Sequence, residues 1–189
     1  MKIGLEHYAY GINDPALDRK NDWFIQIVSC NTHNLAALID TIALGPEKED
    51  NLEEAKFVCM RRANDLSEDG EFLPAPEVGK HDDQTFGTHQ GRDAHYLFKT
   101  LGLDLNIYSS ALKLNTQYMH TIHFDMMLRR PTTLKDVTQR LKANARIALT
   151  NKNPPRRCSL SVAITAYSAE FLIKRSLSTK VWRCAASAR

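Results

Sequence analysis

Two apolar runs with different spacing stand next to each other near the start of the chain. The first, Trp23 to Val28, is typical of a buried strand, whereas Leu35-Ala36-Ala37-Leu38-Ile39 continues at helical spacing. Gly45-Pro46 ends this helix. The polar segment from Ser29 to Asn34 therefore lies where the pattern predicts a turn from strand to helix.

Strands and helices follow one another without strict alternation in the rest of the chain. The pattern predicts strands at 55–60, 105–114 and 119–128, and helices at 94–101 and from about 133 to 144. Thr133 and Asp136 have the spacing of a capping box, with Asp in place of Glu. We therefore expect an α+β fold with a mainly antiparallel or mixed sheet and helices packed on one face.

Three segments have the composition of connections. Residues 1–22 are rich in turn formers and predict a lead-in loop, and the acidic stretch 47–54 predicts a solvated connection. Residues 64–91 are dense in Gly, Pro, Asp and Ser, and we expect a long ordered excursion without a regular element.

Composition limits the classes of function. With 189 residues, of which 43% are hydrophobic, the chain is long enough for one domain with a sizeable core. The net charge of +3 is too small to indicate a nucleic-acid partner, and no apolar run approaches the ~20 residues that span a membrane. The four cysteines match no metal-binding spacing, so we expect no metal site and a reducing cytoplasmic location.

Cys30 is the candidate nucleophile. A thiol at a helix N-terminus feels the positive end of the helix dipole, which favours the reactive thiolate. A lone cysteine is commonly a small buried apolar residue, but the polar residues that follow Cys30 are typical of a site. The base must come from elsewhere in the chain. His120 and His123 lie on a predicted strand and would face opposite sides of it, and His120 is favoured because it follows a polar segment.

Four short motifs in this chain resemble archaeal-type (type II) glyceraldehyde-3-phosphate dehydrogenase, in the catalytic half that follows its nucleotide-binding domain. The resemblance extends from about residue 10 to residue 152. The motifs, in order, are Ser29-Cys30-Asn31-Thr32, Met60-Arg61-Arg62-Ala63-Asn64-Asp65, Thr88-His89-Gln90-Gly91-Arg92-Asp93 and Thr116-Gln117-Tyr118-Met119-His120. They are similar to the family's Ser-Cys-Asn-Thr, Arg-Arg-Ala-Ala-Asp, Ser-His-His-Gly-Pro-Asp and Thr-Thr-Leu-Met-His segments.

The resemblance implies roles for individual residues. Cys30 would attack the aldehyde of glyceraldehyde 3-phosphate to form a thioester, and His120 would be the base. The residues implied in binding substrate and phosphate are Asn31, Thr32, Arg61, Arg62 and His89. Guanidinium groups suit this role because they are forked donors for phosphate. The implied reaction is the phosphorylating, NAD- or NADP-dependent oxidation of glycolysis and gluconeogenesis, with inorganic phosphate as co-substrate, in a homo-oligomer that is tetrameric in the intact family.

The chain departs from the family pattern in several places. Gln90 replaces the second histidine of one motif, His33-Asn34 replaces Thr-Gly, and the family's second downstream histidine aligns with Ile122 rather than His123. No glycine-rich phosphate loop occurs in the sequence. We therefore expect a chain truncated at its start, without the nucleotide-binding domain, with unknown cofactor-binding residues and no activity on its own.

The last segment also departs from the family. Codons for the family's Gly-Arg-Asp-His-Gly, read from their second base, can encode Val162 to Ala166, and a second family segment read in the same way gives Ala169 to Ser176. We expect three parts: a lead-in remnant at 1–22, a catalytic domain at 23–152 and an out-of-frame, poorly ordered tail at 153–189. A divergent natural tail remains the alternative.

Two other classes of function stay open. Cys30 and His120 could serve a cysteine-dependent hydrolase that uses water and needs no cofactor. The chain could also be a non-catalytic fragment or an oligomerisation module, in which Cys30 would have the reactivity of an ordinary thiol.

Overall fold

The computed structural model describes residues 4–18, 20–61, 76–115, 120–150, 160–164 and 181–184. The strands are β1 (Gly4–Tyr8), β2 (Phe24–Ile27), β3 (Leu52–Arg61), β4 (Glu77–Val78), β5 (Ile107–Lys113), β6 (Thr121–Leu128), β7 (Ile147–Thr150), β8 (Leu160–Ile164) and β9 (Val181–Cys184). The helices are α1 (Cys30–Ile39), which continues as a π-helical turn (Asp40–Leu44), α2 (His89–Lys99) and α3 (Leu134–Ala143).

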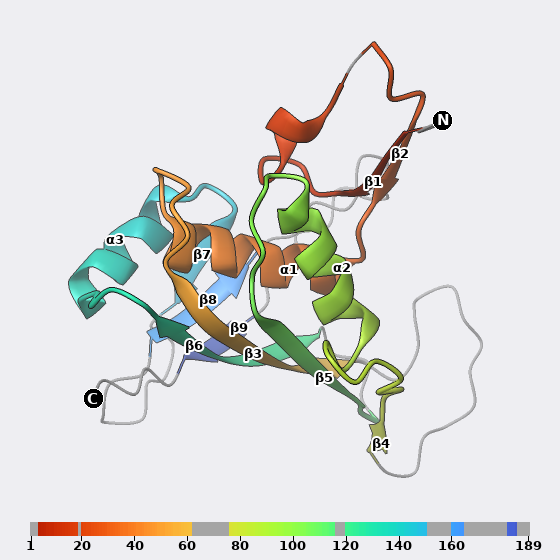
Figure 1. Ribbon diagram of the computed structural model, residues 1–189. Helices are drawn as coiled ribbons and strands as arrows, with labels where there is room; N and C mark the ends of the chain where they lie inside the picture. Colours follow the sequence, from red (N-terminus) through yellow and green to blue (C-terminus); the bar gives the residue numbers. More distant parts are fainter. Residues whose placement is uncertain are drawn as a thin grey trace.

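A mixed sheet forms the base of the fold (Figure 1). Among the described residues its strand order is β4-β5-β3-β6-β9-β8-β7. The central strand β3 pairs in parallel with β5 and antiparallel with β6. β1 and β2 form a separate parallel pair. The predicted α+β class with a mixed sheet is confirmed.

The two faces of the main sheet differ in burial. Ala55, Phe57 and Cys59 on β3 are buried, while Lys56 between them is exposed. The same alternation occurs on β5 and β6, where Ser109 and Phe124 are at the same register as Phe57. Because neighbouring side chains on a strand point to opposite faces, one face of the sheet is covered and the other is open.

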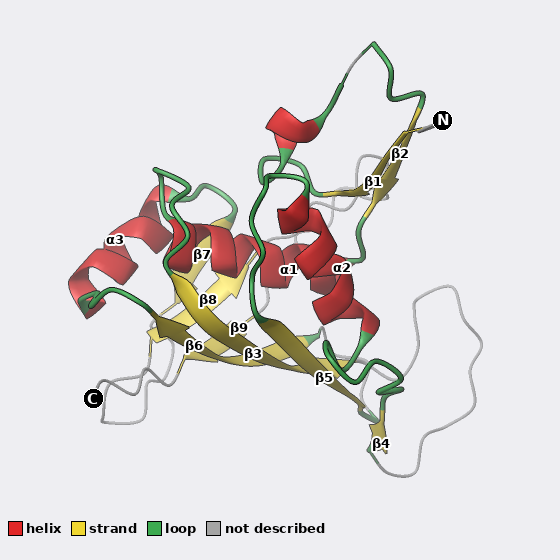
Figure 2. Ribbon diagram, viewed as in Figure 1, coloured by secondary structure: helices red, strands yellow, loops and turns green. Residues whose placement is uncertain are grey.

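Helices α1 and α2 pack against each other over the covered face (Figure 2). The buried residues of α1 and α2 include Leu35, Leu38, Leu97 and Phe98, which belong to the same apolar core as the covered face of β3. α3 packs beside β7 and the π-helical turn. In the described part of the chain, none of the helices combines the length and apolar character needed to cross a bilayer.

The prediction that residues 23–28 form a buried strand was half wrong. The strand is present, but Trp23 and Phe24 are 82% and 71% exposed, and Val28 is the buried residue of the run. β2 pairs with β1 in a separate two-stranded sheet, and all four of its residues are exposed. β-propensity predicted the strand, whereas its burial depended on tertiary context.

Other boundaries differ from the pattern by a few residues. β1 lies within the predicted lead-in loop, β3 begins within the acidic stretch at Leu52, and α2 begins at His89 rather than near 94. The predicted capping box of α3 is confirmed, with Thr133 and Asp136 each bonding the other's backbone N–H. Most of the predicted tail lies outside the described residues, and its out-of-frame origin stays a prediction.

The N-terminal segment docks on the rest of the fold through Arg146. The guanidinium carbon of Arg146 lies 5.5 Å from the centroid of the Tyr10 ring. Gly11 has φ 73°, and a Cβ at this position would lie 1.4 Å from Arg146 Nη2, so glycine is required there. Beside this contact lies His33, which is 5% exposed. Burial and the charge of Arg146 lower the pKa of His33 to about 4, against the opposing effect of a hydrogen bond to the Tyr10 backbone.

His33 should make the fold sensitive to mild acid. Its folded-state pKa of about 4 lies below the usual 6.5, so its contribution to stability is complete above pH 6.5 and is lost as the pH falls toward 4. The loss should be on the order of 3 kcal/mol. Urea denaturation between pH 7.5 and pH 4 measures this effect. His33→Gln should flatten the dependence and the exposed His123→Gln should not; equal profiles for both variants would contradict the assignment.

The environments of Asp40, which follows α1, and Asp136, on α3, shift the pKa values of their carboxyl groups in opposite directions. Asp40 is 8% exposed, and burial raises its pKa although Lys48 pairs with it. Asp136 lies in the capping box, and its hydrogen bonds from Thr133 lower its pKa. The charged form of Asp40 therefore costs stability at neutral pH, whereas the charged form of Asp136 contributes to it.

These environments predict opposite effects for the same substitution. Because the folded-state pKa of Asp40 is raised, its stability contribution is lost as the pH rises through that value, and Asp40→Asn should increase the free energy of unfolding at pH 7. Asp136→Asn should decrease it, since the pKa of Asp136 is lowered and the cap loses its acceptor. Chemical denaturation at pH 7 measures both variants, and a loss of stability in Asp40→Asn would show that the ion pair outweighs burial.

Candidate active site

Cys30 is the first residue of α1, directly after a serine that caps the helix. Ser29 has an extended backbone, and its Oγ accepts a hydrogen bond from the Thr32 N–H at 3.3 Å and lies 2.9 Å from the Thr32 hydroxyl. This arrangement satisfies one of the N–H groups that a helix start leaves free. Cys30 is a half-buried free thiol. The helix start therefore presents the thiol at the positive end of the helix dipole.

Arg61 and His120 lie across from each other at one end of the sheet. Met60 on β3 is paired with Thr121 on β6, so the residues next along these strands, Arg61 and His120, are neighbours. Both continue the alternation of the buried residues Cys59 and Ile122, which places them on the face that the helices cover. His120 is 7% exposed and has a partner of its own. The Arg61 Nε is buried and has no hydrogen-bond partner among the described residues.

His123 is on the other face of the same strand. It is paired with Val58 and is exposed on the open face of the sheet. The strand alternation therefore separates the two candidate histidines as the sequence predicted. His120 is the one on the side of α1, and this position supports its predicted role as the base.

The ends of four elements gather on the same side of the molecule (Figure 1). They are the N-terminal ends of α1 and α2, the C-terminal end of β3 and the start of β6. The predicted residues Cys30, Arg61, His89 and His120 lie at these ends. Chain segments that are distant in sequence thus bring the predicted nucleophile, base and cationic groups to one region.

The start of α2 is anchored to β5 and leaves His89 in solvent. The Ser109 hydroxyl lies 2.6 Å from the Thr88 hydroxyl and accepts a hydrogen bond from the Gly91 N–H at 2.8 Å. Gln90, which stands in place of the second histidine of the related motif, is 2% exposed and pairs with Thr88. Of His89 and Gln90, only His89 has an exposed side chain, so His89 is the one that can contact an anion.

Two further predicted site residues, Thr32 and Asn31, lie in the first turn of α1, and a third, Arg62, lies outside the described residues. The Thr32 hydroxyl pairs with Ser29, which gives it a capping role. Asn31 is 3% exposed, and its Oδ1 has no partner within the described part of the chain. Arg62 lies outside the described residues, as do residues 116–119. The substrate contacts of these three residues stay predictions.

The first turns of α1 carry an unusual group of buried polar atoms. Those without a hydrogen-bond partner among the described residues are Asn31 Oδ1, His33 Nε2, Asn34 Nδ2 and Asn34 Oδ1. Sequence reasoning counted Asn34 among the polar residues after Cys30 that are typical of a site and as a departure from the related motif, but gave it no role of its own. The signal that could have singled it out is its position four residues after Cys30, which places both on one face of the helix.

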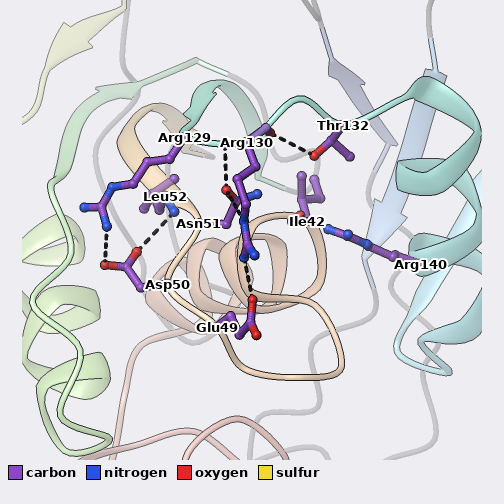
Figure 3. Close-up of polar contacts among 9 residues, drawn as sticks. All are labelled: Ile42, Glu49, Asp50, Asn51, Leu52, Arg129, Arg130, Thr132 and Arg140. Carbon is purple, nitrogen blue, oxygen red and sulfur yellow. Dashed lines mark hydrogen bonds and ion pairs between the residues drawn. The ribbon is translucent and has the colours of Figure 1, made fainter.

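A cavity of about 720 Å³ lies at the opposite end of α1, between the π-helical turn and α3. Asp40 at that end is ten residues from Cys30, or about 15 Å along a helix. Ion pairs join several of the charged groups near this cavity (Figure 3). Arg129 bonds Asp50 at 2.8 Å and Arg130 bonds Glu49 at 2.7 Å.

The backbone around this cavity is held by the same set of contacts. Arg130 N–H donates to Asn51 Oδ1 and Arg140 donates to the Ile42 carbonyl, both at 2.8 Å (Figure 3). The first bond connects the end of β6 to the residue before β3, and the second connects α3 to the π-helical turn. We therefore assign the arginines around this cavity to the fold rather than to the chemistry of Cys30.

The described residues offer little for a metal or a dinucleotide. Within the described ranges, no three His, Cys, Asp or Glu side chains come together as a metal site. The sequence carries no glycine-rich phosphate loop. The groups at the candidate site instead suit covalent thiol chemistry on an anionic substrate.

Comparisons with known proteins agree with the residue pattern. No protein-family model matches the chain. Over 127 residues, 66% of this chain and 34% of the relative, it is 29% identical to glyceraldehyde-3-phosphate dehydrogenase 2 of Methanosarcina acetivorans. Over 125 residues and the same shares, it is 27% identical to glyceraldehyde-3-phosphate dehydrogenase of Methanococcoides burtonii. The chain thus spans about a third of the length of the curated relatives it matches. The part of the chain that resembles these glyceraldehyde-3-phosphate dehydrogenases is 66% of its own length.

Proposed function

We propose that this chain is the catalytic part of a phosphorylating, archaeal-type glyceraldehyde-3-phosphate dehydrogenase, with Cys30 as its nucleophile. The observation that carries the proposal is the capped helix start at Cys30, with His120 and Arg61 paired on the helix-covered face of the neighbouring sheet. The similarity to the two archaeal dehydrogenases, over 127 and 125 residues of the chain, supports the proposal. Glyceraldehyde 3-phosphate and inorganic phosphate are the proposed substrates.

The chemistry begins at the thiol. The Cys30 thiolate attacks the aldehyde carbon, a C–S bond forms, and the carbonyl oxygen takes up the electron pair. His120 is proposed to take up the proton of the resulting hydroxyl. In the phosphate half of the reaction, inorganic phosphate attacks the carbonyl carbon of a Cys30 thioester, the C–S bond breaks, and the acyl phosphate leaves with Cys30 again as thiolate.

Arg61 is proposed to hold one of the two phosphates. Its Nε–H is buried and has no hydrogen-bond partner in the described part of the chain, and a guanidinium has forked donors that match phosphate oxygens. His89 at the exposed start of α2 and Arg62 next to Arg61 are proposed as further phosphate contacts. Asn31 and Thr32 are proposed to orient the substrate beside the thiol.

NAD or NADP would accept the hydride in the oxidation step. The residues of this chain do not fit a dinucleotide, because the glycine-rich turn that holds a pyrophosphate is absent from the sequence. We derive no step through that cofactor, and we propose that the 189-residue chain on its own is inactive in nicotinamide reduction.

The phosphate half of the reaction needs no cofactor and tests the proposal. Acetyl phosphate should acylate Cys30, because the thiolate attacks the acyl carbon and the C–O bond to phosphate breaks. Peptide mapping of the purified chain should place the acetyl group on Cys30, and inorganic phosphate should remove it. Cys30→Ser should abolish the label, whereas Cys59→Ala, which changes a buried thiol of the core, should keep it.

The other two classes of function give different results in this experiment. A cysteine hydrolase would release the acetyl group to water at the same rate with and without inorganic phosphate. An oligomerisation module would leave Cys30 as little labelled as Cys59. Either result would contradict the dehydrogenase proposal.

The phosphate-binding role of Arg61 predicts a selective effect. Loss of a charge-assisted hydrogen bond of about 1.5–3 kcal/mol should slow acylation by acetyl phosphate roughly tenfold to hundredfold in Arg61→Gln. Acylation by p-nitrophenyl acetate, which has no phosphate, should stay close to that of the wild type. The matched control is Arg129→Gln, which breaks the ion pair with Asp50 at the other end of the sheet and should leave both rates unchanged. Equal slowing with both reagents would contradict a phosphate contact.

A further inference from the structure

Asn34 is the least satisfied polar side chain of α1. It is 0% exposed, and neither its Nδ2 nor its Oδ1 has a hydrogen-bond partner among the described residues. A carboxamide can donate two hydrogen bonds and accept two. The next residue, Leu35, and the residue one turn on, Leu38, are equally buried and apolar, as a core position requires.

A buried amide without partners destabilises the folded state. The cost of leaving such groups unpaired is about 1–3 kcal/mol, and native structures contain few of them. The same helix shows the usual solution at its other end, where Asn144 Nδ2 donates to the Thr41 hydroxyl at 2.8 Å. An apolar residue at position 34 would fill the site without this cost, so stability alone does not account for the asparagine.

Helix geometry directs the Asn34 side chain toward Cys30. Side chains of an α-helix point toward its N-terminus, and residues i and i+4 share a face. Asn34 is four residues after Cys30 in α1, so this spacing puts the two side chains on one face of the helix. Cys30 is half-buried and Asn34 is buried.

We propose that Asn34 is a positioning residue that donates an Nδ2–H hydrogen bond to the Cys30 sulfur when the thiolate forms. A neutral amide stabilises the anion and orients its lone pairs without adding a charge that would repel an anionic substrate. The inference rests on the proposed function of Cys30 as nucleophile. It concerns this chain in particular, because the related motif has glycine where Asn34 stands.

Alkylation of Cys30 by iodoacetamide over a range of pH tests the proposal. Asn34→Ala should slow alkylation at pH 7 about threefold to tenfold and displace the midpoint of the rate-against-pH curve to higher pH, since a hydrogen bond to a charged group is lost. Its free energy of unfolding should be unchanged or higher, because unpaired buried atoms are removed. Asn34→Leu, which keeps the shape of the side chain, should behave in the same way and covers the case in which the alanine variant folds poorly.

A structural role for Asn34 predicts the reverse combination. If the amide is satisfied by an ordered water within the fold, Asn34→Leu would lose stability while alkylation keeps the wild-type rate and midpoint, and this result would overturn the inference. The control Asn144→Ala should lose stability, because it breaks the bond to Thr41, and should leave the alkylation curve unchanged.

The wild-type curve separates this inference from the proposed function. If wild-type Cys30 alkylates no faster at pH 7 than glutathione, the nucleophile assignment fails and the inference fails with it. If wild-type Cys30 is fast and both Asn34 variants match it, the inference alone is overturned.

Discussion

The pairing register of β3 is the constraint on which the fold and the candidate site both depend. β3 is bonded to β5 on one side and to β6 on the other, and its buried residues alternate with exposed ones along its length. A slip of one residue would turn Phe57 and Cys59 to solvent and move Arg61 away from the helices. The apolar core therefore fixes the position of a cationic side chain that contributes nothing to that core.

The same register couples His120 to Arg61. Both lie one residue beyond the pair Met60 and Thr121, and Arg61 is the last residue of β3. At this position a side chain keeps the facing set by the strand. The end of a central strand is thus a place where a protein can hold a base and a cation in a defined relation.

α1 divides into parts with different degrees of polar satisfaction. Around its far end, each arginine of the cluster has a carboxylate, amide or carbonyl partner (Figure 3). Near its start, Asn31, His33 and Asn34 hold buried polar atoms without partners among the described residues. Paired charges stabilise a fold and leave little capacity for a ligand, whereas unpaired buried donors and acceptors cost stability and are available to bind. The cavity between the π-helical turn and α3 is therefore a poorer candidate for chemistry than the start of α1.

Local patterns predicted the elements whose signals are local. The helix after Cys30, the strand at β3 and the Thr133 capping box follow from spacing and side-chain hydrogen bonding within a few residues. The exposure of Trp23 could not be predicted in this way, because it depends on tertiary context, including the pairing of β2 with β1 apart from the main sheet.

The candidate site shows the same division between local and tertiary information. Strand alternation in the sequence was enough to place His120 and His123 on opposite faces, but only the pairing with β3 shows which face carries the helices. The sequence placed Asn34 in a polar group typical of a site but gave it no separate role, because its burial is visible only when α1 is packed. A polar residue four positions after a nucleophile is a signal that sequence reasoning can use. Such a residue conflicts with the core when it is buried, and the conflict persists where function requires it.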